Sequence, residues 1–288
     1  EMAFELIYTS VERGLRPGSS GYCTVAHSRG LPPTTVKILE SLSTYKSLYS
    51  VHEEHSAENP VSYSHYTSSL LGHGSSVLSR ITPSGADHTG RSNKLAHHIL
   101  LQSNEYAAAG PLWLSQQEGF FLENWQDKPR IIEEAKTIPD PQLSFSGANS
   151  WAELCGDAGY ASLLARDFIT APTTPVFVIF SPGMPMLSLL AEAAALLPVA
   201  QRWKITYNTY FSSLPVGVTC LWRCCVQDSD IIRDIRRNPQ SKVYDLTGEL
   251  PPPQEDKLTE LARSGYSDIS EIDKAKDDEK PQAPKRKF

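Results

Sequence analysis

The sequence predicts an α+β protein with a mainly antiparallel, sheet-rich N-terminal half, a C-terminal half that mixes helices and strands, and a disordered tail. Apolar and polar residues alternate through most of the first hundred residues, as is typical of half-buried strands. Helical spacings follow, and apolar residues become sparse after Pro251. We therefore expect a sheet-rich subdomain over residues 2–130, an α/β-type subdomain over 145–250 that packs with it, and a disordered charged tail over 251–288.

Five segments of the N-terminal half alternate as strands do, and one helix interrupts them. The expected strands are Phe4 to Val11, Gly21 to His27, Val61 to Thr67, Ser76 to Ile81 and Lys94 to Gln102. The expected helix runs from Pro33 to about Tyr45, because apolar residues recur at every third position and two prolines stand at its start. Thr34 and Thr35 are available as caps.

The second half opens with a predicted helix from Ser150 to about Phe168. Ser150 and Glu153 have the spacing of a capping box, in which each side chain bonds to a backbone N–H near the start of the helix. Apolar residues then recur at steps of three and four, which places them on one helix face.

Five further elements are predicted after this helix. Val176 to Phe180 is wholly apolar, as expected of a strand covered on both faces. Leu187 to Leu197 is an almost entirely apolar helix that ends before Pro198. Trp203 to Phe211 and Val218 to Val226 alternate on either side of a turn and are interpreted as a hairpin, and Asp230 to Arg236 as a helix.

Composition excludes several classes of protein. The net charge of −6 gives no support to binding nucleic acid through a broad basic surface. The chain has no apolar run long enough to cross a membrane and no signal peptide. Its five cysteines are an odd number without a CxxC pair, which suits a reducing compartment, so we expect a cytoplasmic protein.

The C-terminal end has two interpretations. The last eight residues contain Lys285, Arg286 and Lys287 and no acidic residue. The end is either a free basic terminus or a cut before a membrane segment or further domain. In the second case the chain is the cytoplasmic part of a membrane-anchored protein.

Histidines and cysteines lack the spacing of metal ligands. All eight histidines fall within the first 98 residues, but His52-Glu53-Glu54-His55 is one residue short of the HExxH zinc motif. His97 and His98 are adjacent on a predicted strand and therefore point to opposite faces. Cys220 and Cys224 are expected to share a face, with Cys225 opposite, as small buried hydrophobes. We predict no metal site.

Signatures of nucleophilic catalysis and of nucleotide binding are also missing. The sequence contains no GxSxG, GxxxxGK[ST] or GxGxxG motif, so we expect no cofactor. Ser181-Pro182-Gly183 between a strand and a helix could place a helix N-terminus near an anion. Pro182 and Pro185 remove amide donors there, which favours a packing turn.

The densest polar cluster runs from Asp87 to Lys94 and leads directly into a predicted strand. Arg91 offers a planar fork of donors for a carboxylate or phosphate, Gly90 permits close backbone approach, and Asp87 could orient His88 or Arg91. The alternative is an ordinary loop whose short polar side chains bond to their own backbone. On the strand that follows, His97 is expected to be buried and His98 to be freer.

Three segments carry a resemblance to a known family. They are Leu6 to Val11, Gly18 to Tyr22, and Asp87 to Asn93 with Ala96-His97-His98. In this order they resemble the N-terminal domain, type 2, of the bacterial GTPase-associated protein family. A weaker match covers Trp203 to Tyr210 with Trp222-Arg223, and the resemblance spans about Met2 to Asp245.

The resemblance implies an adaptor or sensor component that is grouped with GTPases in bacterial conflict systems, and it carries over no catalytic residue. We expect an interaction module rather than an enzyme, with a protein partner, for which a GTPase is the candidate. The alternatives are an anion-binding sensor or enzyme that uses Arg91 with His88 or His98 as acid or base, and a structural scaffold. The expected site residues are Asp87, His88, Thr89, Arg91, Asn93, His98, Tyr8, Ser10 and Ser20.

Overall fold

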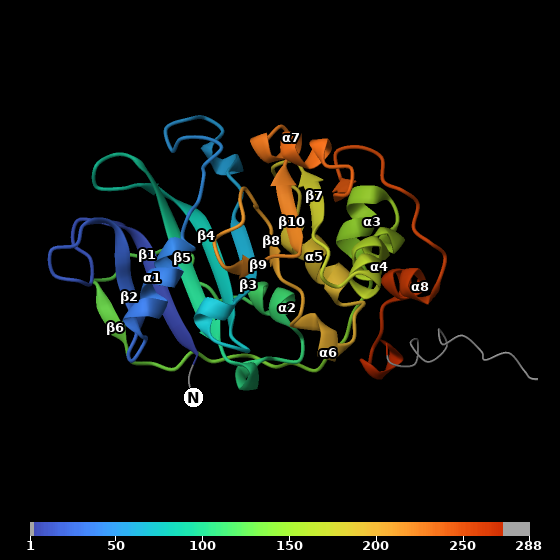
Figure 1. The fold of residues 1–288 in the computed structure, drawn as a ribbon, viewed down its shortest axis with the longest axis horizontal. Helices are drawn as coiled ribbons and strands as arrows, with labels where there is room; N and C mark the ends of the chain where they lie inside the picture. Colours follow the sequence, from blue (N-terminus) through green and yellow to red (C-terminus); the bar gives the residue numbers. More distant parts are fainter. Residues whose placement is uncertain (1–2, 273–288) are drawn as a thin grey trace, which may run out of the picture.

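Eleven strands form one mixed sheet in the computed structural model, which describes residues 3–272 (Figure 1). They are β1 (Phe4–Val11), β2 (Gly21–Ser28), β3 (Ser62–Ser68), β4 (Ser76–Ala86), β5 (Ser92–Leu101), β6 (Arg130–Ile132), β7 (Val176–Phe180), β8 (Tyr207–Asn208), β9 (Val218–Thr219), β10 (Trp222–Val226) and β11 (Lys242–Asp245). Their order is β11-β7-β10-β8-β3-β4-β5-β1-β2-β6, and β9 also pairs with β3. Strands β1 to β5 pair antiparallel, whereas β7 pairs parallel with β10 and β11.

Helices cover both faces of this sheet. They are α1 (Pro33–Ser41), α2 (Pro111–Ser115), α3 (Asn149–Cys155), α4 (Ser162–Thr170), α5 (Met186–Ala194), α6 (Val199–Arg202), α7 (Asp230–Arg237) and α8 (Lys257–Ser264). Four 3-10 turns are η1 (Ser56–Glu58), η2 (Ser69–Leu71), η3 (Ser103–Glu105) and η4 (Ala158–Ala161). The mixture of an antiparallel sheet region and a helix-rich half confirms the predicted α+β class.

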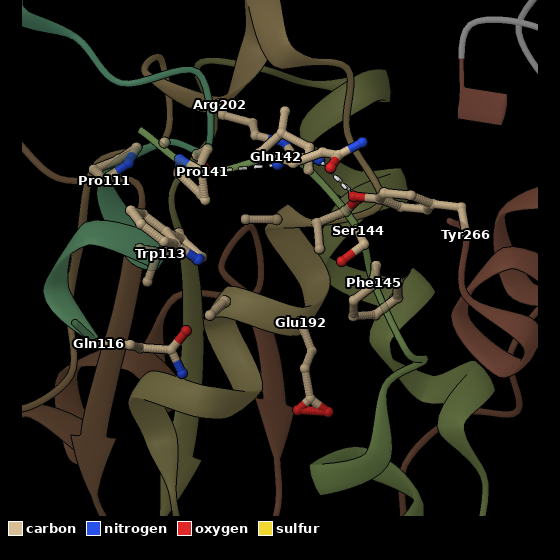
Figure 2. Close-up of a pocket in the computed structure, with 17 residues that line it drawn as sticks. Pro111, Trp113, Gln116, Pro141, Gln142, Ser144, Phe145, Glu192, Arg202 and Tyr266 are labelled. Carbon is tan, nitrogen blue, oxygen red and sulfur yellow. Dashed lines mark hydrogen bonds between the residues drawn. The ribbon is translucent and has the colours of Figure 1, made fainter. Parts of the chain in front are cut away.

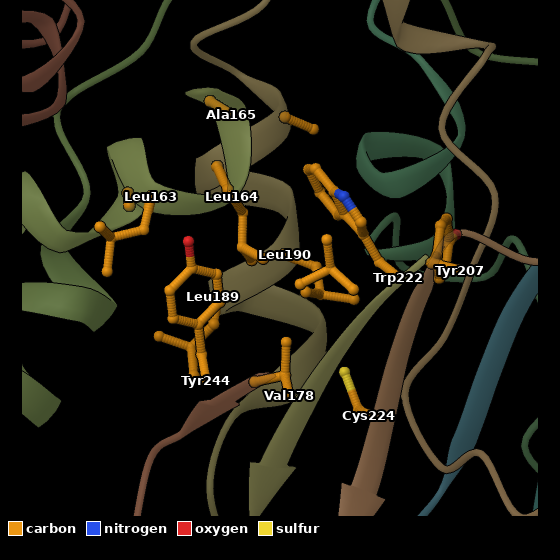
Figure 3. Packing of buried hydrophobic residues seen from close by; sticks show 14 of the residues in the cluster. Leu163, Leu164, Ala165, Val178, Leu189, Leu190, Tyr207, Trp222, Cys224 and Tyr244 are labelled. Atoms are coloured by element: carbon orange, nitrogen blue, oxygen red, sulfur yellow. The ribbon is translucent and has the colours of Figure 1, made fainter. Parts of the chain in front are cut away.

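The two faces of the sheet have separate hydrophobic cores. Val178 and Ile179 are neighbours on β7, so their side chains point to opposite faces. Val178 packs with the buried side chains of α3, α4 and α5, among them Leu164 and Leu189 (Figure 3). Ile179 belongs to the core on the other face, which α1 and α7 cover. The predicted strand from Val176 to Phe180 therefore has both faces covered, as expected.

The predicted hairpin between Trp203 and Val226 is wrong. Strands β8 and β10 run parallel, with Trp222 beside Tyr207 and Arg223 beside Asn208. Between them the chain forms β9, which pairs antiparallel with β3. Alternation alone predicts strands, but it does not fix their partners.

The predicted helix from Ser150 to Phe168 is divided into three pieces. Helix α3 ends at Gly156, whose φ of 81° is the left-handed conformation that glycine adopts at helix ends. Asp157 then accepts a hydrogen bond from the N–H of Gly159 and starts η4, which continues into α4. No side chain caps α3, so the capping box at Ser150 does not form. Helix α1 likewise begins at Pro33 without a side-chain cap and ends at Ser41, earlier than expected.

All five cysteines are free, and Cys220, Cys224 and Cys225 are buried as small hydrophobes. Cys224 and Cys225 lie in the cores on opposite faces, as predicted. Cys220 shares the core of Cys225 rather than that of Cys224, because it precedes β10 and is not part of its regular alternation.

The predicted disordered tail over residues 251–288 is wrong for residues 251–272, which are part of the described fold. Residues 257–264 form α8, whose Thr259 and Ala262 are fully buried. Asp256 caps this helix through the N–H of Thr259 and pairs with Arg166 at 2.6 Å. The fully buried residues of this helix are small or polar, and Leu258 and Leu261 pack against the core while only partly buried, so the segment lacks the apolar pattern of a buried helix. The remainder of the predicted tail, residues 273–288, lies outside the described residues.

Within the described residues, no helix combines the length and apolarity needed to cross a membrane.

Candidate functional site

The polar cluster predicted from the sequence forms the loop between β4 and β5. Its backbone is closed by hydrogen bonds from Asp87 N to Arg91 O (2.8 Å) and from Gly90 N to Asp87 O (2.9 Å). Gly90 has a φ of 81°, a conformation that other residues rarely adopt. One carboxylate oxygen of Asp87 accepts from the N–H and hydroxyl of Thr89 and from the N–H of Arg91. The loop is therefore organised around the Asp87 carboxylate.

Asp87 and Asn93 also tie the loop to the neighbouring strand β1. The Ser10 hydroxyl donates to the second oxygen of Asp87 at 2.8 Å. Asn93 Oδ1 accepts from the N–H of Ser10 (3.2 Å) and the hydroxyl of Thr9 (3.3 Å). The Thr89 hydroxyl, with Ser10 and the loop N–H groups, holds the pKa of Asp87 far below its usual range. A carboxylate that accepts this many bonds stays ionised and fixes the loop in place.

A third contact comes from the segment before η1. The Val51 N–H donates to the Ser92 hydroxyl at 2.9 Å, and His52 Nε2 lies 2.8 Å from the carbonyl oxygen of Gly90. On the other side, the Tyr22 hydroxyl donates to the carbonyl oxygen of Ser92 at 2.9 Å. Groups far apart in the sequence therefore hold the loop on both sides.

The side chains that this framework leaves exposed are those of His88, Thr89 and Arg91. Within residues 3–272, neither the His88 imidazole nor the Arg91 guanidinium makes a hydrogen bond or ion pair with a side chain or backbone group. The backbone N–H of Arg91 is used by the loop, but the planar fork of its side chain is available to a partner.

An aromatic pair with a lysine adjoins the loop. The rings of Tyr8 and Tyr22 are stacked with centroids 6.2 Å apart, and Tyr22 is 42% exposed. The Lys94 ammonium lies 4.9 Å from the centroid of the Tyr22 ring and 5.9 Å from that of Tyr8. Burial lowers the pKa of Lys94. Sequence reasoning did not select Tyr22 and Lys94, although Tyr22 ends one of the segments that carried the resemblance and Lys94 ends the polar cluster.

We call these residues the loop surface: Tyr8, Ser10, Tyr22, Asp87, His88, Thr89, Arg91, Asn93 and Lys94. Of the expected site residues it lacks Ser20 and His98. Ser20 is exposed beside the start of β2, and no hydrogen bond or ion pair joins it to the loop in the described part of the chain. His98 was expected to be the freer histidine, but it is fully buried under α1, with ring nitrogens bonded to the hydroxyls of Ser79 (2.6 Å) and Ser43 (2.8 Å).

His97 is buried, as expected. Its Nδ1 accepts from the N–H of Leu122 at 3.0 Å, which places the ring proton on Nε2, 2.9 Å from the Glu5 carboxylate. Both nitrogens are thus occupied, and burial lowers the pKa of His97. Among residues 3–272, no three or more histidine, cysteine or acidic side chains gather where they could hold a metal ion.

The geometry defines an α+β protein with a fixed, cation-bearing loop at one end of its antiparallel region. Two family models match the chain: GTPase-associated protein 1, N-terminal domain type 2, over residues 2–138, and GTPase-associated protein 1, middle domain, over residues 148–248. The chain belongs to the GTPase-associated protein 1 family. No curated protein and no solved structure shows significant similarity to it.

Proposed function

We propose that the protein is an interaction module, an adaptor or sensor, that binds a GTPase through the loop surface and acts with it in a bacterial conflict system. The family link to GTPases supports the choice of partner. The observation that carries the choice of surface is Arg91, which is exposed without a partner among the described residues on a loop whose backbone is fixed.

A fixed loop favours binding because little conformational freedom is lost when the partner arrives. Arginine and tyrosine are the residues that most often dominate the binding energy of protein interfaces. The loop surface presents Arg91 on the same loop whose Ser92 carbonyl accepts from the Tyr22 hydroxyl, and the Lys94 ammonium over the Tyr22 ring adds positive charge. We therefore infer that the matching region of the GTPase is acidic and that a carboxylate pairs with Arg91.

The enzymatic alternative requires His88 or His98 as acid or base, and one of these two histidines is unsuitable. His98 is enclosed by Ser43 and Ser79 and cannot act as acid or base for a ligand at Arg91. His88 is exposed, but no described carboxylate orients its ring. Recognition of a protein partner uses the exposed cation and needs no such orientation.

The test measures binding of a GTPase encoded beside this protein, by calorimetry at two salt concentrations. Arg91→Lys keeps the charge but loses the planar fork, so we expect binding to weaken by about 1 to 3 kcal/mol while the melting temperature stays unchanged. Arg237 on α7 is exposed and makes no ion pair with another described residue, so Arg237→Lys is the matched control. Equal weakening by both variants, or an Arg91→Lys variant that melts well below the parent, would remove the proposal.

A further inference from the structure

A cavity of about 210 Å³ lies where three parts of the chain meet (Figure 2). Helix α2 belongs to the region matched by the N-terminal family domain, and α5 belongs to the matched middle domain. Residues 141–145 connect the two matched regions, and Tyr266 follows both. Sites between structural units are common places for small-molecule binding.

Arg202 lies on this cavity and is only 5% exposed. Its Nε donates to the carbonyl oxygen of Leu197 (3.0 Å), and its Nη2 donates to the carbonyl of Ala195 (3.1 Å) and the hydroxyl of Tyr266 (2.8 Å). Its Nη1 makes one long bond, 3.4 Å, to the carbonyl of Ala109. All these partners are neutral, and a second N–H of Nη1 has no partner among the described residues.

A buried guanidinium is seldom left without an anion. The carbonyl groups after the last turn of α5 carry partial negative charge and compensate part of the charge of Arg202. No carboxylate completes the compensation in the described chain. The acidic side chain that lines the cavity, Glu192, points away from Arg202 (Figure 2) and accepts instead from the N–H of Ser150 at 2.7 Å. Burial raises the pKa of Glu192.

The rest of the cavity offers apolar walls and hydrogen-bond donors. Trp113 and Phe145 lie on opposite sides of it (Figure 2). The Trp113 indole N–H and the side chains of Gln142 and Ser144 make no hydrogen bond to another described residue. A charged group at one end, aromatic walls and a few polar groups at the rim are the usual composition of a small-molecule site.

We propose that this cavity binds a small organic oxyanion, whose carboxylate or phosphate group pairs with Arg202 and whose flat apolar body lies between Trp113 and Phe145. The site is separate from the loop surface and does not depend on the function proposed for it.

The first test uses benzoate, phenyl phosphate and inorganic phosphate as probes. The indole N–H signal of Trp113 is assigned in an NMR spectrum of the full chain by its loss in Trp113→Phe. We expect this signal to shift saturably, with benzoate or phenyl phosphate binding at least about tenfold more tightly than inorganic phosphate, because the ring buries apolar surface. Comparison of the two aromatic probes distinguishes carboxylate from phosphate. A Trp113 signal that none of the probes moves at millimolar concentration would overturn the proposal.

The second test fills the cavity without touching Arg202, because Arg202→Ala would also free the carbonyl groups after α5. Ala191→Leu adds side-chain volume to the cavity wall, and Ala135→Leu adds the same volume at an exposed alanine elsewhere. We expect Ala191→Leu to weaken binding of the aromatic probes by at least about tenfold and Ala135→Leu to bind as the parent does. If Ala191→Leu folds and binds as tightly as the parent, Arg202 serves only to cap α5.

Discussion

Asp87 and Arg91, four residues apart on one loop, have opposite roles. Both carboxylate oxygens of Asp87 accept hydrogen bonds from within the protein, which is the arrangement of a structural residue. Arg91 contributes only backbone groups to the loop and leaves its guanidinium exposed. The two interpretations of the polar cluster, binding loop and self-bonded loop, therefore do not exclude each other, because Asp87 bonds within the loop while the Arg91 guanidinium stays exposed.

His98 provides a pH-dependent contribution to stability. Burial between Ser43 and Ser79 lowers its pKa from 6.5 to about 3. Between these values the unfolded chain binds a proton that the folded protein does not, so the free energy of unfolding falls as the pH falls. The contribution of His98 is complete above pH 6.5 and is lost as the pH falls through the folded pKa of about 3.

We predict that His98→Gln removes this dependence, because glutamine can bond to both hydroxyls but cannot take up a proton. Between pH 6.5 and 5, urea unfolding should show the parent losing about 2 kcal/mol more stability than the variant. His65 and His97 are present in both proteins, so their own pH-dependent contributions to stability cancel in the comparison. Parallel curves for the two proteins would mean that His98 titrates normally in the folded state.

The sequence correctly predicted the sheet face of a side chain where only the alternation along a strand was needed. It placed His97 and His98 on opposite faces, and the structure agrees, with Glu5 paired to one and Ser43 to the other. It could not tell that α1 covers the second face, because Leu39 and Ser43 meet β5 only through the fold. For the same reason the choice of His98 as a freer residue was wrong.

At the scale of elements, local patterns identified most strands and helices but not their partners. Strands β1 to β5 and β7 have strong alternation or continuous apolar character and lie close to the expected ranges, except that β4 continues beyond Ile81 to Ala86. Strands β8 and β9 are only two residues long and are defined by their pairing, β8 with β3 and β10 and β9 with β3. No local signal of two residues can specify a partner that is more than a hundred residues away.

The packing of helix α8 on the fold was not predicted, because its fully buried side chains, Thr259 and Ala262, are small or polar. The Thr259 hydroxyl bonds to Ser162 (2.8 Å) and Arg263 pairs with Asp157 (2.8 Å), so side-chain hydrogen bonds contribute much of the contact with η4 and α4. Beyond the helix, Tyr266 exchanges backbone hydrogen bonds with Phe145 (2.7 and 2.8 Å).

We predict that a chain ending at Pro253 is less stable than one ending at Ile272, which retains every described contact of α8. Removing the buried groups around Thr259 and Tyr266 opens the surface of α4 and leaves Arg202 without its hydroxyl partner. The loss should be about 3 kcal/mol or more by urea unfolding. Equal stability of the two chains would show that α8 contributes no net stability to the fold.

At the scale of the whole molecule, the sheet crosses the boundary between the two matched family domains. Strand β3 of the first region pairs with β8 and β9 of the second, and the cavity beside Arg202 takes its walls from both. Sequence composition suggested two subdomains that pack together, but it could not show a shared sheet, because each half has its own local pattern.

Asn208 joins the two regions at the centre of the sheet. Its amide donates to the Tyr66 hydroxyl at 2.6 Å, and its carbonyl oxygen accepts from the Ser62 hydroxyl at 3.0 Å. Both hydroxyls belong to β3, whereas Asn208 belongs to β8. Asn208→Ala would leave these buried groups without their partner, which costs about 2 to 4 kcal/mol.

If the shared sheet makes the two matched regions one cooperative unit, the stability lost in Asn208→Ala must be lost by both regions. We predict that hydrogen exchange, followed by mass spectrometry in increasing urea, loses protection in peptides from β5 and β7 at the same denaturant concentration. Asn208→Ala should move both midpoints down together, because β5 and β7 then report one unfolding equilibrium. Asn124→Ala, at an exposed asparagine outside the sheet, should move neither. A variant in which β7 opens while β5 stays protected would mean that the pairing of β3 with β8 is too weak to couple the two regions.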